Sequence, residues 1–132
     1  MNKTFEFVCQ YGVLKKNLLG GYTNKIKNTL DVKTILHFDN AYIRVILYNI
    51  DRNDGEGIHN EDNILYYKNI NKIVFAEDTC TMTIEETGST DENGELMDGG
   101  EVTFFIDMDF LDEICNILDL LAQNGYFKLV EG

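Results

Sequence analysis

A strand that runs directly into an amphipathic helix, between Glu101 and Gly125, constrains the fold more than any other stretch of this chain. In residues 101–107 apolar side chains alternate with others, which is the period of two of a half-buried strand. From Asp109 onward apolar residues recur every three or four positions, as on one face of a helix: Phe110, Leu111, Ile114, Leu118 and Leu121. Such a helix is not stable alone, so we expect it to cover the core or open end of a sheet built by the preceding residues.

Both ends of this helix are marked in the sequence. Asp107 or Asp109 can accept hydrogen bonds from the free amides of the first turn, and two further acids there suit the positive end of the helix dipole. Asn124 and Gly125 offer a left-handed stop. We therefore predict a helix from Asp109 to Asn124.

The remaining residues predict about seven strands. Apolar patterns bounded by turn residues place strands at 4–11, 33–39, 42–50, 64–67, 70–76, 79–86 and 101–107, with a short edge strand at 126–130. The strand 42–50 is apolar enough to be covered on both faces, and the polar gaps 51–63 and 87–100 are expected to be surface loops. We predict one α+β domain, 1–132: a strongly bent antiparallel sheet or partly open barrel with one C-terminal amphipathic helix.

The cysteines and the absence of targeting signals indicate a compartment. Cys9, Cys80 and Cys115 are odd in number, widely spaced and each within an apolar pattern. We expect them to be small buried thiols in a reducing compartment. No signal-peptide pattern opens the chain, and no apolar run approaches the length of a membrane span. We expect a cytoplasmic protein with no membrane partner.

The formal net charge is -12, and it is unevenly distributed along the chain. Residues 1–50 contain seven Lys or Arg and three Asp or Glu. Residues 51–132 contain four Lys or Arg and twenty Asp or Glu. Between Ile73 and Phe127 there are fourteen acids and no Lys or Arg. High charge of one sign keeps a protein soluble, but it also suits a surface that meets something positive.

Four stretches resemble, in the pattern of their elements, the bacterial pleckstrin-homology-like and GRAM-like domains. These are the segment from Ile64 to Phe75, the strands from Cys80 to Ile84 and from Val102 to Ile106, and the helix from Asp109 to Asn124. The resemblance implies a bent sheet with the helix across one end, and a binding role. The chain departs from the family in having few basic residues near the loops that would bind phosphoinositide, so a lipid ligand is not implied.

No motif for catalysis is present. The chain has no Gly-x-Ser-x-Gly sequence, and no phosphate-binding glycine motif follows a strand. His37 and His59 belong to no zinc-binding pattern. Neither polar gap fits an EF-hand loop, although a looser divalent-cation site among Asp91, Asn93 and Glu95 stays open. We predict a non-enzyme with no cofactor and no resident metal.

The acidic second gap is the strongest functional feature. If strands 79–86 and 101–107 pair through it, seven carboxylates gather at and above its base: Glu85, Glu86, Asp91, Glu92, Glu95, Asp98 and Glu101. Like charges facing across strands repel, and docking onto a basic surface would relieve that repulsion. We predict a non-catalytic acidic protein that binds a basic protein surface through these residues. Its narrowest form is a nucleic-acid-mimicking inhibitor from a mobile element, and repulsion by phosphate argues against direct nucleic-acid binding.

Two other functions stay open. A small molecule or peptide would fit the mouth of the bent sheet, beside four tyrosines: Tyr42, Tyr48, Tyr66 and Tyr67. Alternatively, the chain is a structural component that forms homo-oligomers through an edge strand at 4–11 or 126–130.

Overall fold

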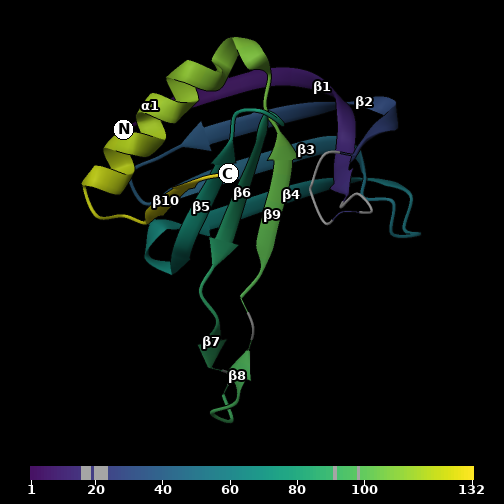
Figure 1. Ribbon diagram of the computed structural model, residues 1–132. Coiled ribbons are helices and arrows are strands. Elements are labelled where there is room, and N and C mark those ends of the chain that lie inside the picture. Colours follow the sequence, from purple (N-terminus) through teal and green to yellow (C-terminus); the bar gives the residue numbers. More distant parts are fainter. Residues whose placement is uncertain (16–18, 20–23, 91, 98) are drawn as a thin grey trace.

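The structure is a computed structural model that describes residues 1–15, 19, 24–90, 92–97 and 99–132 (Figure 1). Its first four strands form one antiparallel sheet in chain order: β1 (Lys3–Lys15), β2 (Asn24–Phe38), β3 (Tyr42–Asp51) and β4 (Ile58–Tyr66). The second four-stranded sheet has the order β10-β5-β6-β9: β5 (Ile70–Ala76), β6 (Thr81–Glu86), β9 (Glu101–Phe105) and β10 (Lys128–Glu131).

Short connecting elements complete the chain. The 3-10 turn η1 (Tyr67–Asn69) joins the two sheets, and a second one, η2 (Met108–Phe110), leads into the helix α1 (Leu111–Gln123). The chain is therefore mostly β, with antiparallel sheets and one C-terminal helix, as predicted. None of the helices in the described part of the chain is both long and apolar enough to cross a membrane.

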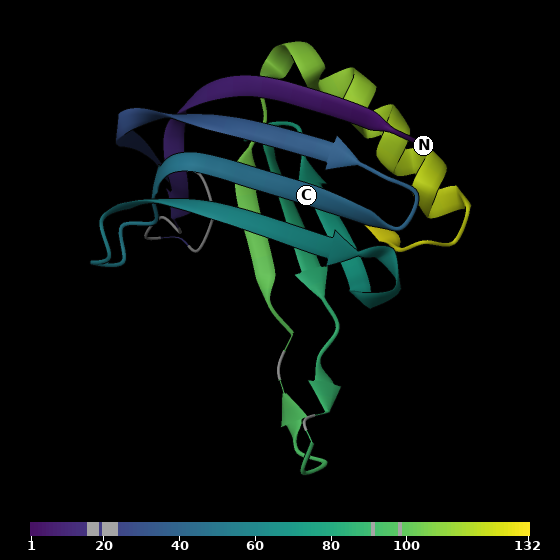
Figure 2. The ribbon, with the colours of Figure 1, turned by 180° about the vertical axis from the view of Figure 1, so that it is seen from behind.

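The two sheets pack face to face with crossed strand directions, which Figure 2 shows from the side of the first sheet. Inward-facing residues of both four-stranded sheets meet in one hydrophobic core. Completely buried side chains come from both sheets and from α1: Leu36, Phe38, Ile43, Val45, Leu47, Ile73, Met82, Ile84, Ile114 and Leu118. One continuous core therefore holds the sheets and the helix together.

Helix α1 closes one end of the space between the sheets (Figure 1). Ile114 and Leu118 are fully buried, and Leu121 is 5% exposed, so one face of the helix belongs to the core. Just before the helix, the ring of Phe110 lies 5.7 Å from that of Phe5 in β1. The predicted role of the helix as a cover over the sheet is confirmed.

The predicted end signals of the helix are also present. The carboxylate of Asp107 accepts a hydrogen bond of 2.9 Å from the amide of Asp109, which caps the 3-10 turn before α1. Gly125 has a φ of 85°, in the left-handed region that glycine adopts without strain. The helix itself begins two residues later than predicted, at Leu111.

The strand arrangement differs from the prediction in several respects. Eight of the described strands form two four-stranded sheets, neither closed into a barrel, because η1 ends β4 and turns the chain into a second sheet. Residues 58–63, predicted as loop, belong to β4. Strand β3 is covered on one face only, since Val45 is fully buried whereas Tyr48 is 36% exposed. The predicted edge strand after the helix is β10, but it pairs with β5 in parallel.

Side chains of β1 and of the segment after β3 contact the free edge of β9. The backbone groups of even-numbered residues, from Gly100 to Phe104, form the hydrogen bonds with β6. The backbone carbonyls of the odd-numbered residues therefore point away from β6. The guanidinium of Arg52 donates to the carbonyl of Thr103 at 2.7 Å. The thiol of Cys9 lies 3.6 Å from the carbonyl of Phe105. These side-chain contacts replace the strand pairing that a closed barrel would have here.

Truncation of the buried face of α1 should destabilise the whole protein. We expect Leu118→Ala to lower the free energy of unfolding by about 2–5 kcal/mol, because it leaves a cavity between the helix and both sheets. Leu120→Ala, two residues away at a side chain that is 49% exposed, should cost less than about 1 kcal/mol. Urea denaturation followed by circular dichroism measures both, and equal losses would show that α1 does not seal the core.

Candidate functional site

A two-stranded arm, residues 87–100, projects from the second sheet on the side away from α1 (Figure 1). It contains the short strands β7 (Ser89–Thr90) and β8 (Leu96–Met97), which pair antiparallel. Glu92 and Glu95 are exposed near its tip. The arm connects β6 to β9, so the predicted pairing of these strands through the second polar gap is confirmed.

Two like charges face each other at the base of the arm. Glu85 and Glu101 are direct cross-strand neighbours in β6 and β9. Lys72 lies 3.6 Å from the carboxylate of Glu85, and the side chain of Asn71 donates to it at 3.2 Å. Among the described residues, Glu86 and Glu101 have no ion-pair partner. These three acids line a hollow of about 480 Å³, so most of their negative charge is left uncompensated.

Asp91 and Asp98 lie outside the described residues, and so does part of the looser cation site predicted among Asp91, Asn93 and Glu95. Within the part of the chain that is described, no group of three or more His, Cys, Asp or Glu side chains is arranged to hold a metal ion.

The described acids between Ile73 and Phe127 fall mainly in two separate places. One group is on the arm and at its base; the other lies on α1 and the turn before it, at the far end of the molecule (Figure 1): Asp107, Asp109, Asp112, Glu113 and Asp119. Glu77 and Asp78 lie in the turn between β5 and β6. Lys3 of β1 reaches the second group, with its ammonium 3.0 Å from Glu113. The arm is therefore a distinct acidic surface and not one end of a continuous one.

The base of the arm is tightly packed. A Cβ on Gly99 would lie only 1.8 Å from the backbone oxygen of Glu86, whereas one on Gly100 would have nothing within 4 Å. The amide of Glu86 bonds to the carbonyl of Gly100 at 2.8 Å, and the amide of Thr87 to that of Asn69 at 2.7 Å. The direction in which the arm leaves the sheet is therefore set by backbone contacts.

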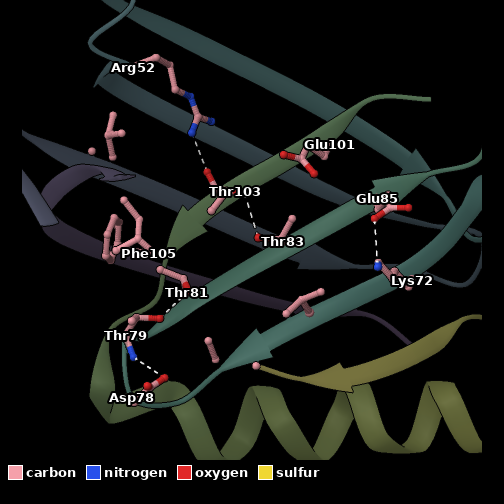
Figure 3. A pocket seen from close by; sticks show the side chains of 16 residues that line it. Arg52, Lys72, Asp78, Thr79, Thr81, Thr83, Glu85, Glu101, Thr103 and Phe105 are labelled. Carbon is pink, nitrogen blue, oxygen red and sulfur yellow. Dashed lines mark hydrogen bonds and ion pairs between the residues drawn. The ribbon is translucent and has the colours of Figure 1, made fainter. Parts of the chain in front are cut away.

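A groove of about 670 Å³ crosses the outer face of the second sheet (Figure 3). Its floor consists of outward-facing side chains of β5, β6 and β9: Val74, Ala76, Thr81, Thr83, Thr103 and Phe105. Residues 12–14 at the end of β1, together with Arg52, line one side. The volume is in the range usual for small-ligand sites. Glu85 and Glu101 line both this groove and the hollow under the arm.

Threonine hydroxyls supply the polar groups of the groove. The hydroxyl oxygens of Thr79 and Thr81 lie 2.8 Å apart, and those of Thr83 and Thr103 lie 2.9 Å apart across the strands (Figure 3). Thr79 and Thr81 are only 9% and 4% exposed. Because a hydroxyl can donate once and accept twice, each pair can still bond to a ligand.

Arg52 fixes the wall of the groove. Its Nε and Nη2 donate to the two carboxylate oxygens of Glu61 at 3.0 and 2.9 Å, and its Nη1 donates to the carbonyl of Thr103. The side chains of Arg52 and Glu61 are 23% and 21% exposed, so this forked pair is partly shielded from water. It connects β4 of the first sheet to β9 of the second.

His59 extends this cluster. Its Nε2 lies 2.8 Å from the carboxylate of Glu61, and its Nδ1 lies 3.0 Å from the carbonyl of Gly57. The Gly57 carbonyl and then the Glu61 carboxylate raise the pKa of His59 above its ordinary value. The hydrogen bond from Arg52 lowers the pKa of Glu61, with smaller contributions from its charge and from His59.

The cysteines and tyrosines lie elsewhere. All three cysteines are free thiols and partly exposed, so the prediction of buried thiols is wrong. Burial raises the pKa of Cys9 to about 11, which keeps this thiol protonated at neutral pH. Tyr42 and Tyr66 pair with ring centroids 5.9 Å apart in the first sheet. The buried Tyr67 donates its hydroxyl to the Asp39 carbonyl at 2.7 Å. The predicted tyrosine site does not coincide with the groove.

Sequence reasoning missed the groove for a physical reason. The alternation of Thr81 and Thr83 with apolar residues indicates which face of β6 they occupy, but nothing in the sequence indicates that the end of β1 forms a wall beside them. Arg52 and Glu61 fell in a predicted loop. No family model, curated protein or solved structure matches the chain, so the site rests on this geometry.

Two neighbouring glycines test the base of the arm. We expect Gly99→Ala to displace the arm, because its new methyl group would overlap the Glu86 carbonyl, and to shift the amide resonances of Glu86 and Glu101 in NMR spectra. Gly100→Ala, with open space at the same point of the chain, should leave those resonances nearly unchanged. If the two substitutions perturb the spectra equally, the arm does not have the base described.

A pH titration tests the cluster around Glu61. We expect NMR to show a raised pKa for His59, and Glu61→Gln to lower that pKa only in part, because the Gly57 carbonyl remains. The stabilisation linked to His59 should be complete below about pH 6.5 and fade as the pH rises through the raised pKa.

The matched control is Asp62→Asn. Asp62 is the next residue of β4, but its carboxylate binds Arg44 at 2.6 Å, so its loss should leave the pKa of His59 where it was. An equal effect of both substitutions would contradict a specific contact between His59 and Glu61.

Proposed function

We propose that this protein is a non-catalytic binding protein whose acidic arm docks onto a basic surface of a partner. The observation that carries the proposal is the cross-strand pair Glu85 and Glu101 at the base of a projecting arm. Side chains of like charge so placed repel each other, and a basic partner that approached them would turn this repulsion into attraction. The sequence between Ile73 and Phe127, which contains no Lys or Arg, supports the same conclusion.

The shape of the arm supports a docking role as well as its charge does. Its exposed tip carries Glu92 and Glu95, and its base carries Glu85, Glu86 and Glu101. Carboxylates at the tip of a narrow projection can enter a basic groove that is too narrow to admit the body of the protein. The narrowest form of this proposal is nucleic-acid mimicry by an inhibitor that a mobile element carries. In that form, duplex DNA or RNA competes with the arm for the same surface of the partner.

Two further expectations belong to this proposal. A binding role is what the resemblance of four stretches of the sequence to pleckstrin-homology-like and GRAM-like domains implies, and the proposal keeps that role. The free thiols Cys9, Cys80 and Cys115 support a location in the reducing cytoplasm.

The groove supports a second candidate function, the binding of a small ligand. It combines an apolar floor, paired hydroxyls and charged ends in a volume suited to a small molecule. Its walls come from both sheets, and the Arg52 contacts hold them in place without a ligand. Oligomer formation is supported only by the position of β1 and β10 at sheet edges.

Charge reversal at the tip of the arm tests the docking function. A partner would first be recovered from an extract of the source organism at graded salt, purified, and its affinity measured by biolayer interferometry. We expect the double variant Glu92→Lys with Glu95→Lys to bind about tenfold more weakly or worse, because attraction becomes repulsion. Affinity of the unmodified protein should fall as salt rises to about 0.15 M and beyond.

The control carries the same change in net charge elsewhere. Asp31→Lys with Asp112→Lys alters exposed acids on β2 and α1, away from the arm, and should preserve most of the affinity. If both double variants lose affinity equally, only the net charge matters and the arm is not the docking surface. Competition by duplex DNA would separate nucleic-acid mimicry from other acidic docking.

A further inference from the structure

We propose that the groove binds a flexible alkylammonium cation, supplied either by a free polyamine or by a lysine side chain of the basic partner. This inference rests on the proposal that the groove is a ligand site, and it adds the chemistry of the ligand. Three features of the groove favour an alkylammonium ligand: its apolar walls, basic side chains that are already paired with acids or carbonyls, and acids at its two ends that have no basic partner among the residues that the structure describes.

The apolar part of the groove suits a methylene chain. Val74 and Ala76 of β5 and Phe105 of β9 face the groove from below, and Val13 and Leu14 of β1 line its side. Tyr11 packs on Phe105 with ring centroids 5.7 Å apart, and this contact holds the Phe105 ring in place. An alkyl chain that leaves water for such walls is stabilised by roughly 0.8 kcal/mol per fully buried CH₂ group.

The basic residues of the groove are already paired. The guanidinium of Arg52 donates hydrogen bonds to Glu61 and to the carbonyl of Thr103. The ammonium of Lys72 lies 3.6 Å from the carboxylate of Glu85. Neither presents an uncompensated positive charge to an incoming anion. A phosphate or carboxylate ligand would have to displace one of these partners, so the groove disfavours anions.

Two acids of the groove have no basic partner in the described part of the chain. Asp78 accepts a hydrogen bond from the amide of Thr79 at 3.0 Å, and Glu101 faces Glu85 across the strands. Figure 3 shows Asp78 and Glu101 at opposite ends of the groove. The strand between them, from Thr81 to Glu85, advances about 13 Å over four residues. A chain with an ammonium group at each end would reach both carboxylates.

The threonine pairs match the middle of such a ligand. Thr83 and Thr103 lie between the two acids, where their hydroxyl oxygens can accept hydrogen bonds from the secondary ammonium groups of a polyamine. Lysine offers the same terminal ammonium and methylene chain without these inner charges. The two sources of the ligand therefore differ in the contacts they make with Thr83 and Thr103.

Isothermal titration calorimetry with spermine and with an acetylated hexalysine peptide tests the inference on the intact protein. We expect measurable binding of at least one of them, and affinity about three- to tenfold lower in each of the variants Asp78→Asn and Glu101→Gln. Asp31→Asn, an equal charge change on β2, should leave the affinity unchanged. Thr83→Val should weaken spermine more than hexalysine.

The outcomes distinguish a free polyamine from a lysine of the partner, and they distinguish the choice of ligand from the proposal that the groove is a ligand site. Tighter binding of spermine assigns the groove to a free polyamine, and tighter binding of hexalysine assigns it to a lysine of the partner. Binding that is insensitive to Asp78→Asn and Glu101→Gln, or that Mg²⁺ reproduces at equal charge, overturns the inference. Failure of both amines also overturns it; thermal stabilisation by a neutral or anionic metabolite would then preserve the groove as a ligand site. These results come from free amines alone, whereas the test of the arm uses the purified partner.

Discussion

Burial of one apolar face from each of two crossed sheets is the constraint on which the rest of this structure depends. Both sheets give inward-facing residues to the shared core, as Val45 of β3 and Ile84 of β6 do, and α1 seals the open end with Leu118. Because the core takes one face of the second sheet, its other face is left to residues such as Thr83 and Thr103. Both candidate sites lie on surfaces that the core does not need, so they can carry charges and hydroxyls at little cost in packing.

The meeting of β1 with β9 shows how the fold manages a sheet edge that is close to another sheet but not paired with it. Free carbonyls at such an edge are costly when they are removed from water. Arg52 donates to one of them, and Glu61 balances the charge that Arg52 brings. The same pair explains why β4 carries a polar residue on its inner face: Glu61 faces Arg52 and not the aliphatic core. The contacts of Arg52 that satisfy the edge of β9 thus also form one wall of the groove.

Patterns of apolar residues were sufficient for the helix, the strand 70–76 and the pairing through the acidic gap, because burial dominates these features. The ends of the helix followed instead from capping residues. The apolar patterns failed at residues 58–63, where the inward side chains are polar and Glu61 is held by a contact with Arg52, nine residues earlier. They also failed to separate the two sheets, since only the turn η1 marks the change. For the site, the register brought Glu85 and Glu101 together as predicted, whereas the groove depends on β1, which is distant in sequence from β6.

The arm and the groove are not independent, because Glu85 and Glu101 line both. A cation held in the groove by Glu101 would neutralise a charge that the arm offers to a basic partner, and a partner bound at the base of the arm would do the same to the groove. By linkage, each ligand must then weaken the affinity of the other by the same factor, whatever the distance between their remaining contacts. A lysine that enters the groove from the docked partner avoids this conflict, since one molecule then satisfies both sites. For this reason the electrostatics favour a single extended basic partner over two separate ligands.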